Sequence, residues 1–198
     1  MNHYYSNNTN LEHEFQNFTF ILKGKQFKFT TDSGVFSKAT IDYGSRVLID
    51  TFSAENLPAG PLLDVGCGYG PIGLSLAYAW QREVEMVDVN ERALALAQKN
   101  ASQNQIENVD IHLSNIYENV HQKQYAAIIS NPPIRAGKKV VHTILSDSYD
   151  LLVPGGTLTV VIQKKQGAPS AQKKMQEVFG NADILKKDKG YYIIQSMK

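Results

Sequence analysis

From residue 61 onward, the chain alternates short apolar runs with helix-like segments, and this pattern restricts its fold more than any other feature. Apolar runs that suit buried strands lie at Leu62–Val65, Val84–Val87, Val109–Leu113, Ala126–Ser130 and Thr157–Ile162. The helix-like segments between and after them are Ile72–Gln81, Glu91–Gln103, Lys138–Leu151 and Ser170–Phe179. Strands that alternate with helices are joined in parallel by right-handed crossovers. The pattern therefore predicts an α/β fold with a doubly wound sheet.

The segments at both ends of the chain predict β-hairpins around this core. Apolar residues alternate over Phe18–Thr30, on either side of the turn signal Lys23-Gly24-Lys25. The following segment, Asp42–Phe52, suits a short helix. The tail reads as a terminal hairpin whose two strands are Ala182–Lys187 and Tyr191–Gln195. We therefore expect a seven-stranded mixed sheet that ends in an antiparallel hairpin, with a second hairpin as an N-terminal extension.

Composition and length place the chain among ordinary globular domains. At 198 residues it can form one domain with its own core. No apolar run approaches the roughly 20 residues that a membrane span needs. The N-terminus, MNHYYSNNTN, is polar and lacks the apolar stretch of a secretory signal. A single cysteine cannot form an internal disulfide, which suits a reducing compartment. We expect a soluble, cytoplasmic protein.

The charged residues and histidines limit the possible partners. The net charge is +1, so any contact with nucleic acid would have to rest on a local cluster of lysines and arginines. None of the histidines is paired with cysteines or carboxylates at a spacing typical of metal ligands, so we expect no metal. The histidines are His3, His13, His112, His121 and His142.

A glycine-rich segment, Gly66-Cys67-Gly68-Tyr69-Gly70, follows the first apolar run and precedes a helix. Such a turn lets a ligand lie directly on the backbone, near helix N–H groups. Taken alone, this spacing is also common in plain tight turns. Asp64 lies just before the glycines, where a carboxylate can hold the cationic amino group of a methionine moiety and would repel a pyrophosphate. We interpret Cys67 as a small spacer, since no histidine near it in sequence could activate a nucleophile.

Two further positions suit a bound nucleoside. Asp88-Val89 ends the next apolar run, about 20 residues past the glycines. At this position an acidic side chain can accept hydrogen bonds from both ribose hydroxyls. The alternative role for Asp88, as the cap of the helix that starts at Glu91, is already filled by Asn90. Asn115-Ile116 follows the third apolar run, at the expected position of an adenine edge. Asn115 either hydrogen-bonds the adenine or is a simple turn residue.

The most specific motif is Asn131-Pro132-Pro133, at the end of the fourth apolar run. The prolines fix φ and leave nearby carbonyls without competing N–H donors. An amino group on an sp² carbon is a poor nucleophile, because its lone pair is delocalised. Its two hydrogens can donate to the Asn131 side chain and the Pro132 carbonyl, which turns the lone pair toward the methyl group of S-adenosylmethionine (SAM). The motif is therefore predicted to be catalytic and to contact SAM, although it could merely end a strand. On this reasoning Asn131→Asp should lower the rate less than Asn131→Ala does, since a carboxylate oxygen can still accept a hydrogen bond from the target amine.

Together these segments resemble the methyltransferase small domain family, in particular its ribosomal small subunit methyltransferase C group. The resemblance spans nearly the whole chain and includes His3-Tyr4-Tyr5, Gly34-Val35-Phe36-Ser37, Ile41-Asp42-Tyr43-Gly44-Ser45, LLDVGCGYGPIGL, VDVN, SNIY, NPPIRAGK and PGGTL. It implies the class I SAM-dependent (Rossmann-like) methyltransferase fold, with SAM as the methyl donor. It also implies methylation of a guanine N2 in small-subunit ribosomal RNA (rRNA).

The resemblance also implies a domain organisation. Residues 1–198 are expected to form a single methyltransferase domain, with residues 1–55 as the hairpin-and-helix extension and residues 56–198 as the catalytic core. Many members of the group have two tandem domains, and this chain resembles the second, catalytic one. Related Asn-Pro-Pro enzymes often place an aromatic residue after the motif, where it stacks on the target base. Ile134 occupies that position here, so the expected contact is apolar or comes from elsewhere. Phe36 is a candidate lid or stacking residue, or else part of the core.

Several cations follow the strands at the edge of the sheet that binds ligands in doubly wound folds. Arg135, Lys138 and Lys139 follow the fourth apolar run, and Lys164 and Lys165 follow the fifth. They either form a rim that binds ribosomal RNA or the small ribosomal subunit, or are simply a solvated face.

The same chemistry also suits a protein glutamine amide or adenine N6. A non-catalytic SAM-binding module in ribosome assembly is the remaining alternative, and the intact Asn131 argues against it.

Overall fold

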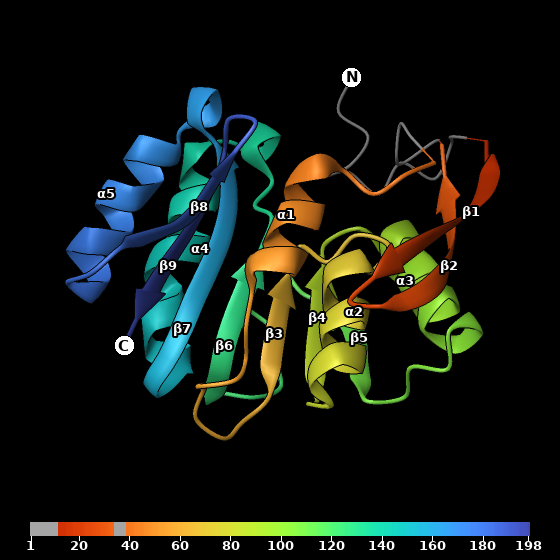
Figure 1. Ribbon diagram of the computed structural model, residues 1–198, viewed down its shortest axis with the longest axis horizontal. Coiled ribbons are helices and arrows are strands. Elements are labelled where there is room, and N and C mark those ends of the chain that lie inside the picture. Colours follow the sequence, from red (N-terminus) through yellow and green to blue (C-terminus); the bar gives the residue numbers. More distant parts are fainter. Residues whose placement is uncertain (1–11, 34–38) are drawn as a thin grey trace.

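A computed structural model describes residues 12–33 and 39–198, and its centre is a seven-stranded sheet (Figure 1). The strand order is β5-β4-β3-β6-β7-β9-β8, in which β9 runs antiparallel to both neighbours and the other pairs are parallel. The mixed sheet with a C-terminal antiparallel hairpin confirms the predicted fold class. The strands are β3 (Leu62–Val65), β4 (Val84–Asp88), β5 (Val109–Leu113), β6 (Tyr125–Ser130), β7 (Leu152–Gln163), β8 (Asp183–Asp188) and β9 (Tyr191–Met197).

Helices cover both faces of the sheet, each over its own hydrophobic core (Figure 1). The first core includes residues of α1 (Tyr43–Thr51), α2 (Pro71–Trp80) and α3 (Glu91–Gln103). The second includes residues of α4 (Lys138–Leu151) and α5 (Ala168–Phe179). None of the helices in the described ranges is long and apolar enough to cross a membrane. Because the strands from β3 to β7 pair in parallel, their carboxyl ends lie at one edge of the sheet, between the two helical layers.

The N-terminal hairpin consists of β1 (Phe15–Leu22) and β2 (Lys25–Asp32). Its two-residue turn has positive φ at both positions, which suits the twist of paired strands. The hairpin packs on α3, where the Asn100 side chain accepts from the Thr30 N–H at 2.8 Å and donates to the Thr30 carbonyl at 3.1 Å. The predicted hairpin is confirmed, and its buried phenylalanines join the first core rather than forming a separate unit.

Several element boundaries differ from the prediction by one to five residues, and two of the differences have a clear cause. β7 begins at Leu152 rather than Thr157, because the chain just before Thr157 pairs with the C-terminus: the Gly155 N–H donates to the Lys198 carbonyl at 2.9 Å. α5 begins at Ala168 rather than Ser170, since proline is tolerated in the first helical turn and Pro169 lies there.

The crossover from β5 to β6 contains no helix, and it brings two histidines together. Residues 114–124 contain only turns, bends and irregular backbone. They return across the sheet so that the His121 ring stacks on the His112 ring, with 3.8 Å between centroids. Each ring also contacts a carboxylate, Glu85 or Asp110. The spacing in the sequence does not reveal these contacts, because the four residues come from three separate segments.

Candidate active site

The glycine loop begins where β3 ends, and its backbone conformation requires glycine. Gly66 and Gly68 have φ of 73° and 57°, a region that side chains disfavour. A Cβ atom added to Gly66 would meet no atom within 4 Å, so this part of the backbone faces open space. The Gly68 N–H donates to Asp88 Oδ2 at 2.9 Å, which ties the loop to the end of β4. The loop is thus held open as a backbone surface for a ligand.

Asp88 lies next to this loop with only 3% of its surface exposed. Its second carboxylate oxygen accepts from the Asn90 N–H at 2.9 Å, so two backbone donors fix the orientation of the side chain. Asn90 itself caps α3, as predicted. Asp88 also lines the larger cavity described below, where its carboxylate can accept hydrogen bonds from ribose hydroxyls.

Asp64 is fully buried behind the loop and lines neither of the cavities described below. Its Oδ2 accepts from the Gly73 N–H at 2.8 Å, which braces the first turn of α2. Burial raises the pKa of Asp64 to about 7; the Gly73 N–H lowers this pKa and the charge of Asp88 raises it. Among the described residues Oδ1 has no hydrogen-bond partner. The contact with the methionine amino group stays a prediction, which Oδ1 would have to make.

Cys67 has the surroundings of a structural residue. The side chain is buried, and burial raises the pKa of its thiol, with further increases from Asp88 and Asp64. A thiol in this setting stays protonated and is a poor nucleophile. This agrees with its interpretation as a spacer.

The larger cavity, of about 500 Å³, lies at the ends of β3, β4 and β5. Most of the predicted cofactor residues line it: Gly66, Asp88, Val89, Asn115, Ile116 and Asn131. Val140 and Ile144 of α4 also line it, and the sequence analysis did not find them. Their one-turn spacing on an amphipathic helix was the available signal. The combination of an acidic residue, a bare glycine backbone and apolar walls fits an adenosine-containing ligand.

A smaller cavity, of about 340 Å³, lies on the other side of Asn131. Cys67 and Gly68 line this cavity rather than the larger one, together with Pro132 and Ile134. The two cavities share a wall made of Gly66, Asn131, Pro133 and Arg135. Two ligands, one in each cavity, would meet at this wall.

The Asn131 amide has a fixed orientation. Its Nδ2 donates to Asp42 Oδ2 at 3.1 Å and to Ser45 Oγ at 3.0 Å, at the start of α1. Because an ionised carboxylate can only accept, the amide nitrogen must face Asp42. The Asn131 oxygen is therefore turned away from α1 as an acceptor. The sequence analysis matched Asp42 and Ser45 to the family without assigning them a role.

Tyr191, the first residue of β9, is a second feature that the sequence analysis missed. It lines the smaller cavity, and its ring centroid lies 5.8 Å from that of Tyr43. A Cβ atom on Gly44 would lie 2.7 Å from the Tyr191 ring, so this glycine makes room for it. An aromatic ring thus lines the same cavity as the Asn131 motif, although Ile134, the residue after the motif, is not aromatic. Phe36 lies outside the described residues.

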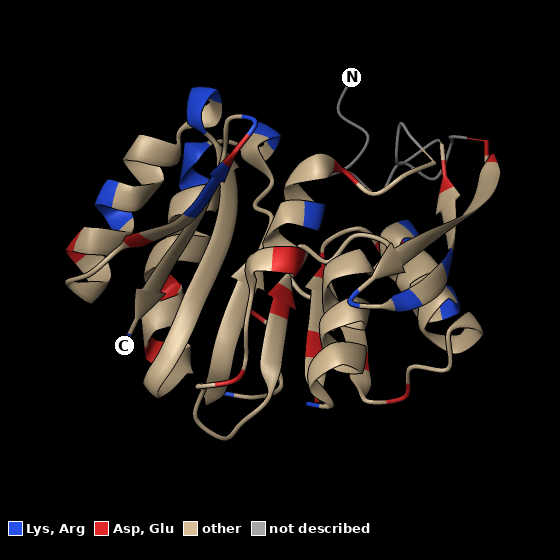
Figure 2. Cartoon of the chain, in the orientation of Figure 1, with Lys and Arg blue, Asp and Glu red and all other residues tan. Residues whose placement is uncertain are grey.

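The predicted cations gather at one end of the molecule. Figure 2 shows Lys and Arg over the segments that follow β6 and β7 and over the β8–β9 hairpin. Arg135 lies in a 3-10 helix at Ile134–Ala136, and Lys138 starts α4. Lys164 and Lys165 lie in a second 3-10 helix that follows β7. The C-terminal hairpin adds three lysines that the sequence analysis did not count: Lys186, Lys187 and Lys189.

The family model of the methyltransferase small domain matches residues 26–195. The chain belongs to the methyltransferase small domain family. It is a SAM-dependent methyltransferase, and membership of this family confirms the expected cofactor.

Similar proteins include the uncharacterized protein YbxB of Bacillus subtilis, 52% identical over 99% of this chain and 98% of the relative. The ribosomal RNA small subunit methyltransferase C of Buchnera aphidicola is 30% identical over 92% of this chain and 56% of the relative. The T. thermophilus 16S rRNA N2 G1207 methyltransferase, solved with AdoMet and guanosine, superposes with a TM-score of 0.82 at 24% identity. That match covers 93% of this chain and 50% of the other. The chain thus spans about half the length of these two named methyltransferases.

Proposed function

We propose that this protein transfers a methyl group from SAM to the exocyclic N2 of a guanine in small-subunit ribosomal RNA. The observation that carries the proposal is the oriented Asn131 amide in the wall between two cavities. The larger cavity suits the cofactor, and the smaller one suits a planar base. Asn131 is then the residue at which the two ligands meet.

Each residue of the site has its own role in the proposed reaction. Asp88 accepts hydrogen bonds from the cofactor ribose, and Asn115 contacts the adenine. When bound, SAM supplies a methyl group on a cationic sulfonium, which is a good leaving group. The Asn131 oxygen and the Pro132 carbonyl accept the two hydrogens of the target amine, so that its lone pair faces the methyl carbon. In that position the amine would be aligned for in-line transfer of the methyl group that SAM would supply, and the methylated amine would lose one proton to water. Positioning and electrostatics carry most of the rate enhancement.

Three observations favour a guanine in RNA over a protein amide. The basic residues lie at the same edge of the sheet as the smaller cavity. Tyr191 lines that cavity, where its ring can stack on a base. The named relatives include small subunit methyltransferases from several bacteria and a large subunit methyltransferase G from Psychromonas ingrahamii. The large subunit is therefore included as a separate arm of the test.

The test supplies methyl-labelled SAM to three substrates: small subunits, large subunits and total protein, all from cells that lack this protein. We expect label in small-subunit RNA, recovered as N2-methylguanine after hydrolysis, and an initial rate of labelling about 10²–10³ lower with Asn131→Ala. Label in the protein fraction or in adenine would overturn the proposed substrate. Label in large subunits alone would support RNA as the substrate but place the methylated guanine in large-subunit RNA.

The basic rim is tested by salt dependence. Lys164→Ala combined with Lys165→Ala should weaken RNA binding and lower the slope of log affinity against log salt by about 1.4–1.8. SAM affinity should not change. The matched control, Lys28→Ala with Lys99→Ala, removes two exposed lysines from β2 and α3 and should leave the slope unchanged. Equal slopes for both double variants would show that Lys164 and Lys165 are only a solvated face.

A further inference from the structure

The loop between β5 and β6 lies over a polar cluster that takes no part in either cavity. α2, α3 and α4 form the other crossovers between parallel strands, but this loop has no helix. It is anchored on Glu85 of β4, whose carboxylate accepts from the backbone N–H groups of His121 at 2.6 Å and Gln122 at 3.3 Å. The site assigned to SAM and RNA does not use these groups.

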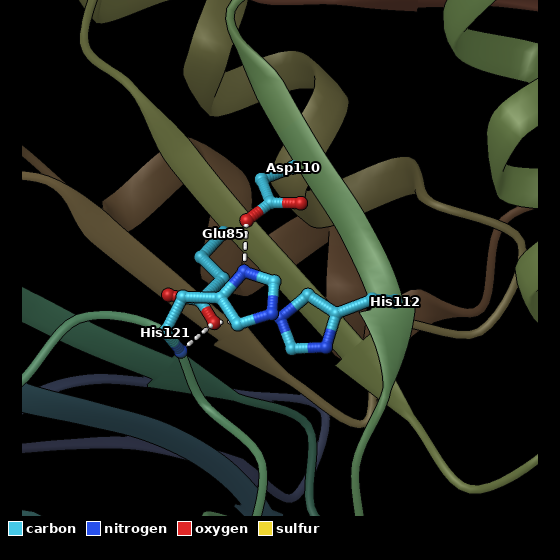
Figure 3. A group of neighbouring side chains, drawn as sticks. All are labelled: Glu85, Asp110, His112 and His121. Carbon is cyan, nitrogen blue, oxygen red and sulfur yellow. Dashed lines mark hydrogen bonds and ion pairs between the residues drawn. The ribbon is translucent and has the colours of Figure 1, made fainter.

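Four side chains with metal-ligand chemistry converge under this loop (Figure 3). Glu85 and Asp110 are partners in the parallel register of β4 and β5, and His112 follows two residues further along β5. His121 comes from the loop. His112 Nε2 lies 2.7 Å from Glu85 Oε1, and His121 Nδ1 lies 2.6 Å from Asp110 Oδ2. One ligand atom of each residue lies within 4.8 Å of those of the other three.

We propose that Glu85, Asp110, His112 and His121 bind one divalent transition-metal ion, and that Zn²⁺ fits this donor set best. Zn²⁺ takes imidazole nitrogen and carboxylate oxygen ligands in a tetrahedron at roughly 2.0–2.2 Å, which sets neighbouring ligand atoms about 3.3 Å apart. The observed separations therefore require only small side-chain movements. With neutral imidazoles the four groups carry two negative charges, which one divalent ion neutralises.

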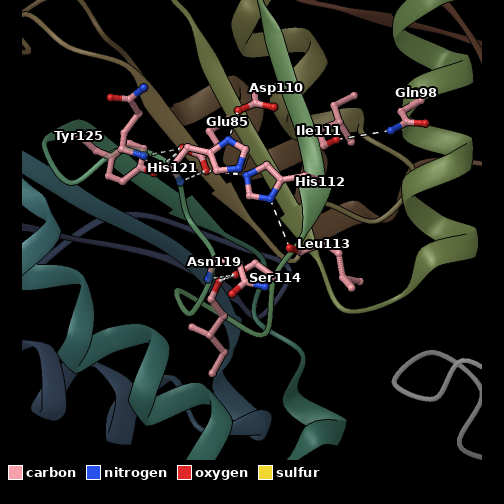
Figure 4. A network of polar contacts seen from close by, with 12 residues as sticks. Glu85, Gln98, Asp110, Ile111, His112, Leu113, Ser114, Asn119, His121 and Tyr125 are labelled. Atoms are coloured by element: carbon pink, nitrogen blue, oxygen red, sulfur yellow. Dashed lines mark hydrogen bonds and ion pairs between the residues drawn. The ribbon is translucent and has the colours of Figure 1, made fainter.

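The surroundings of the cluster would orient its ligands (Figure 4). Glu85 is only 3% exposed, and the Tyr125 hydroxyl donates to its second oxygen. The Leu113 carbonyl lies 3.3 Å from His112 Nδ1, which leaves Nε2 of that ring to face the ion when Nδ1 carries the proton. Such outer contacts fix the orientation of metal ligands in known sites. Asp110 and His121 have side chains that are 53% and 55% exposed, so an ion can enter from solvent.

A network of hydrogen bonds that only anchors the loop is the alternative. It accounts for Glu85, but not for two imidazole rings stacked with an interplanar angle of 12°. In that network each neutral ring donates one N–H to its own carboxylate, and neither ring then offsets the charge of that carboxylate. A divalent ion binds the same four groups with neutral imidazoles and offsets both negative charges.

The position of the cluster gives the ion a structural role. Two residues after His112, the Ser114 hydroxyl donates to the Ile116 carbonyl at 2.9 Å and accepts from the Asn119 N–H at 3.0 Å. This turn lines the larger cavity. An ion that joins β4, β5 and the loop would therefore stabilise the wall of that cavity without entering the chemistry.

The experiment uses the full chain, free of any affinity tag and treated with a chelator. Calorimetry with ZnCl₂ should show one ion per chain. At a free Zn²⁺ concentration 100 times the Kd, the melting temperature should rise by about 5–10 °C. His112→Ala and His121→Ala should each weaken binding by at least about 100-fold. The matched control His142→Ala removes a histidine of α4 outside the cluster and should bind as tightly as wild type.

Asp110→Asn tests the site in a variant that should fold normally, because the Asp110 side chain is half exposed. Its melting temperature without metal should stay near that of wild type, while the Zn²⁺-induced rise disappears. The proposal is wrong if wild type binds no Zn²⁺ by calorimetry. It is also wrong if His112→Ala and His142→Ala show the same Zn²⁺ affinity.

Discussion

The contact between Asp42 and Asn131 makes Asn131→Asp a decisive variant. The Asn131 nitrogen lies 3.1 Å from Asp42 Oδ2. In Asn131→Asp, a carboxylate oxygen takes the place of this donor and faces another carboxylate. The structure therefore reverses the expectation from sequence that this change is milder than Asn131→Ala.

The size of the effect follows from Coulomb's law. Two unit charges 3.1 Å apart repel by about 1.3–2.7 kcal/mol at effective dielectric constants of about 80 to 40, a range suited to the exposed Asp42. Rotation of the new side chain would relieve this repulsion but would withdraw the acceptor from the target amine. Removing one preorganised polar partner costs about 10²–10³ in rate. We expect Asn131→Asp to lose at least that much, as Asn131→Ala does.

Adding Asp42→Asn should restore part of the rate. In the double variant the new amide at position 42 can donate to the new carboxylate at position 131, so a neutral group again faces a charged one. The gain over Asn131→Asp should be about 10- to 100-fold, the repulsion converted to a rate. Asp42→Asn alone should lie within about fivefold of wild type, because asparagine caps helices as well as aspartate does.

The assay is single-turnover methyl transfer at saturating SAM, with thermal melting as the check on folding and a double-mutant cycle as the analysis. If Asn131→Asp retains a rate within about threefold of wild type, Asp42 does not orient the amide. A double variant no faster than Asn131→Asp would lead to the same conclusion.

Three further predictions concern residues that line the two cavities or lie behind the glycine loop. Asp88→Ala should weaken SAM binding by about 1.5–3 kcal/mol; unchanged affinity by calorimetry would contradict the ribose contact. The pKa of Asp64 is raised by burial from 3.8 to about 7, so the ligand-free protein should lose up to about 4 kcal/mol of unfolding free energy as the pH rises from about 4 to about 7. Because a cation nearby favours the ionised form, SAM should bind more tightly at pH 7.5 than at pH 6; Asp64→Asn should remove this dependence, and a flat wild-type profile would contradict the argument. Tyr191→Ala should raise the KM for RNA more than it lowers kcat, whereas Tyr191→Phe should behave as wild type; equal effects of both would exclude stacking.

The sequence by itself determined the order of elements and most of the residues that line the larger cavity. Alternating apolar runs and amphipathic segments are local patterns, and local periodicity fixes which segments become strands or helices. The positive φ at Gly66, the Asn90 cap and the position of Asp88 also follow from short-range rules. These features were predictable because each depends on residues close together in the chain.

Only the tertiary structure decided the contacts between distant segments. Asp42 and Asn131 are separated by 89 positions, and no periodicity connects them. Tyr191 reaches the smaller cavity because the terminal hairpin adds β9 beside β7. His112 meets His121 because the loop after β5 turns back over β4 instead of forming a helix. Strand order and packing bring such residues together, and a pattern that repeats over two to four residues carries no information about which strands become neighbours.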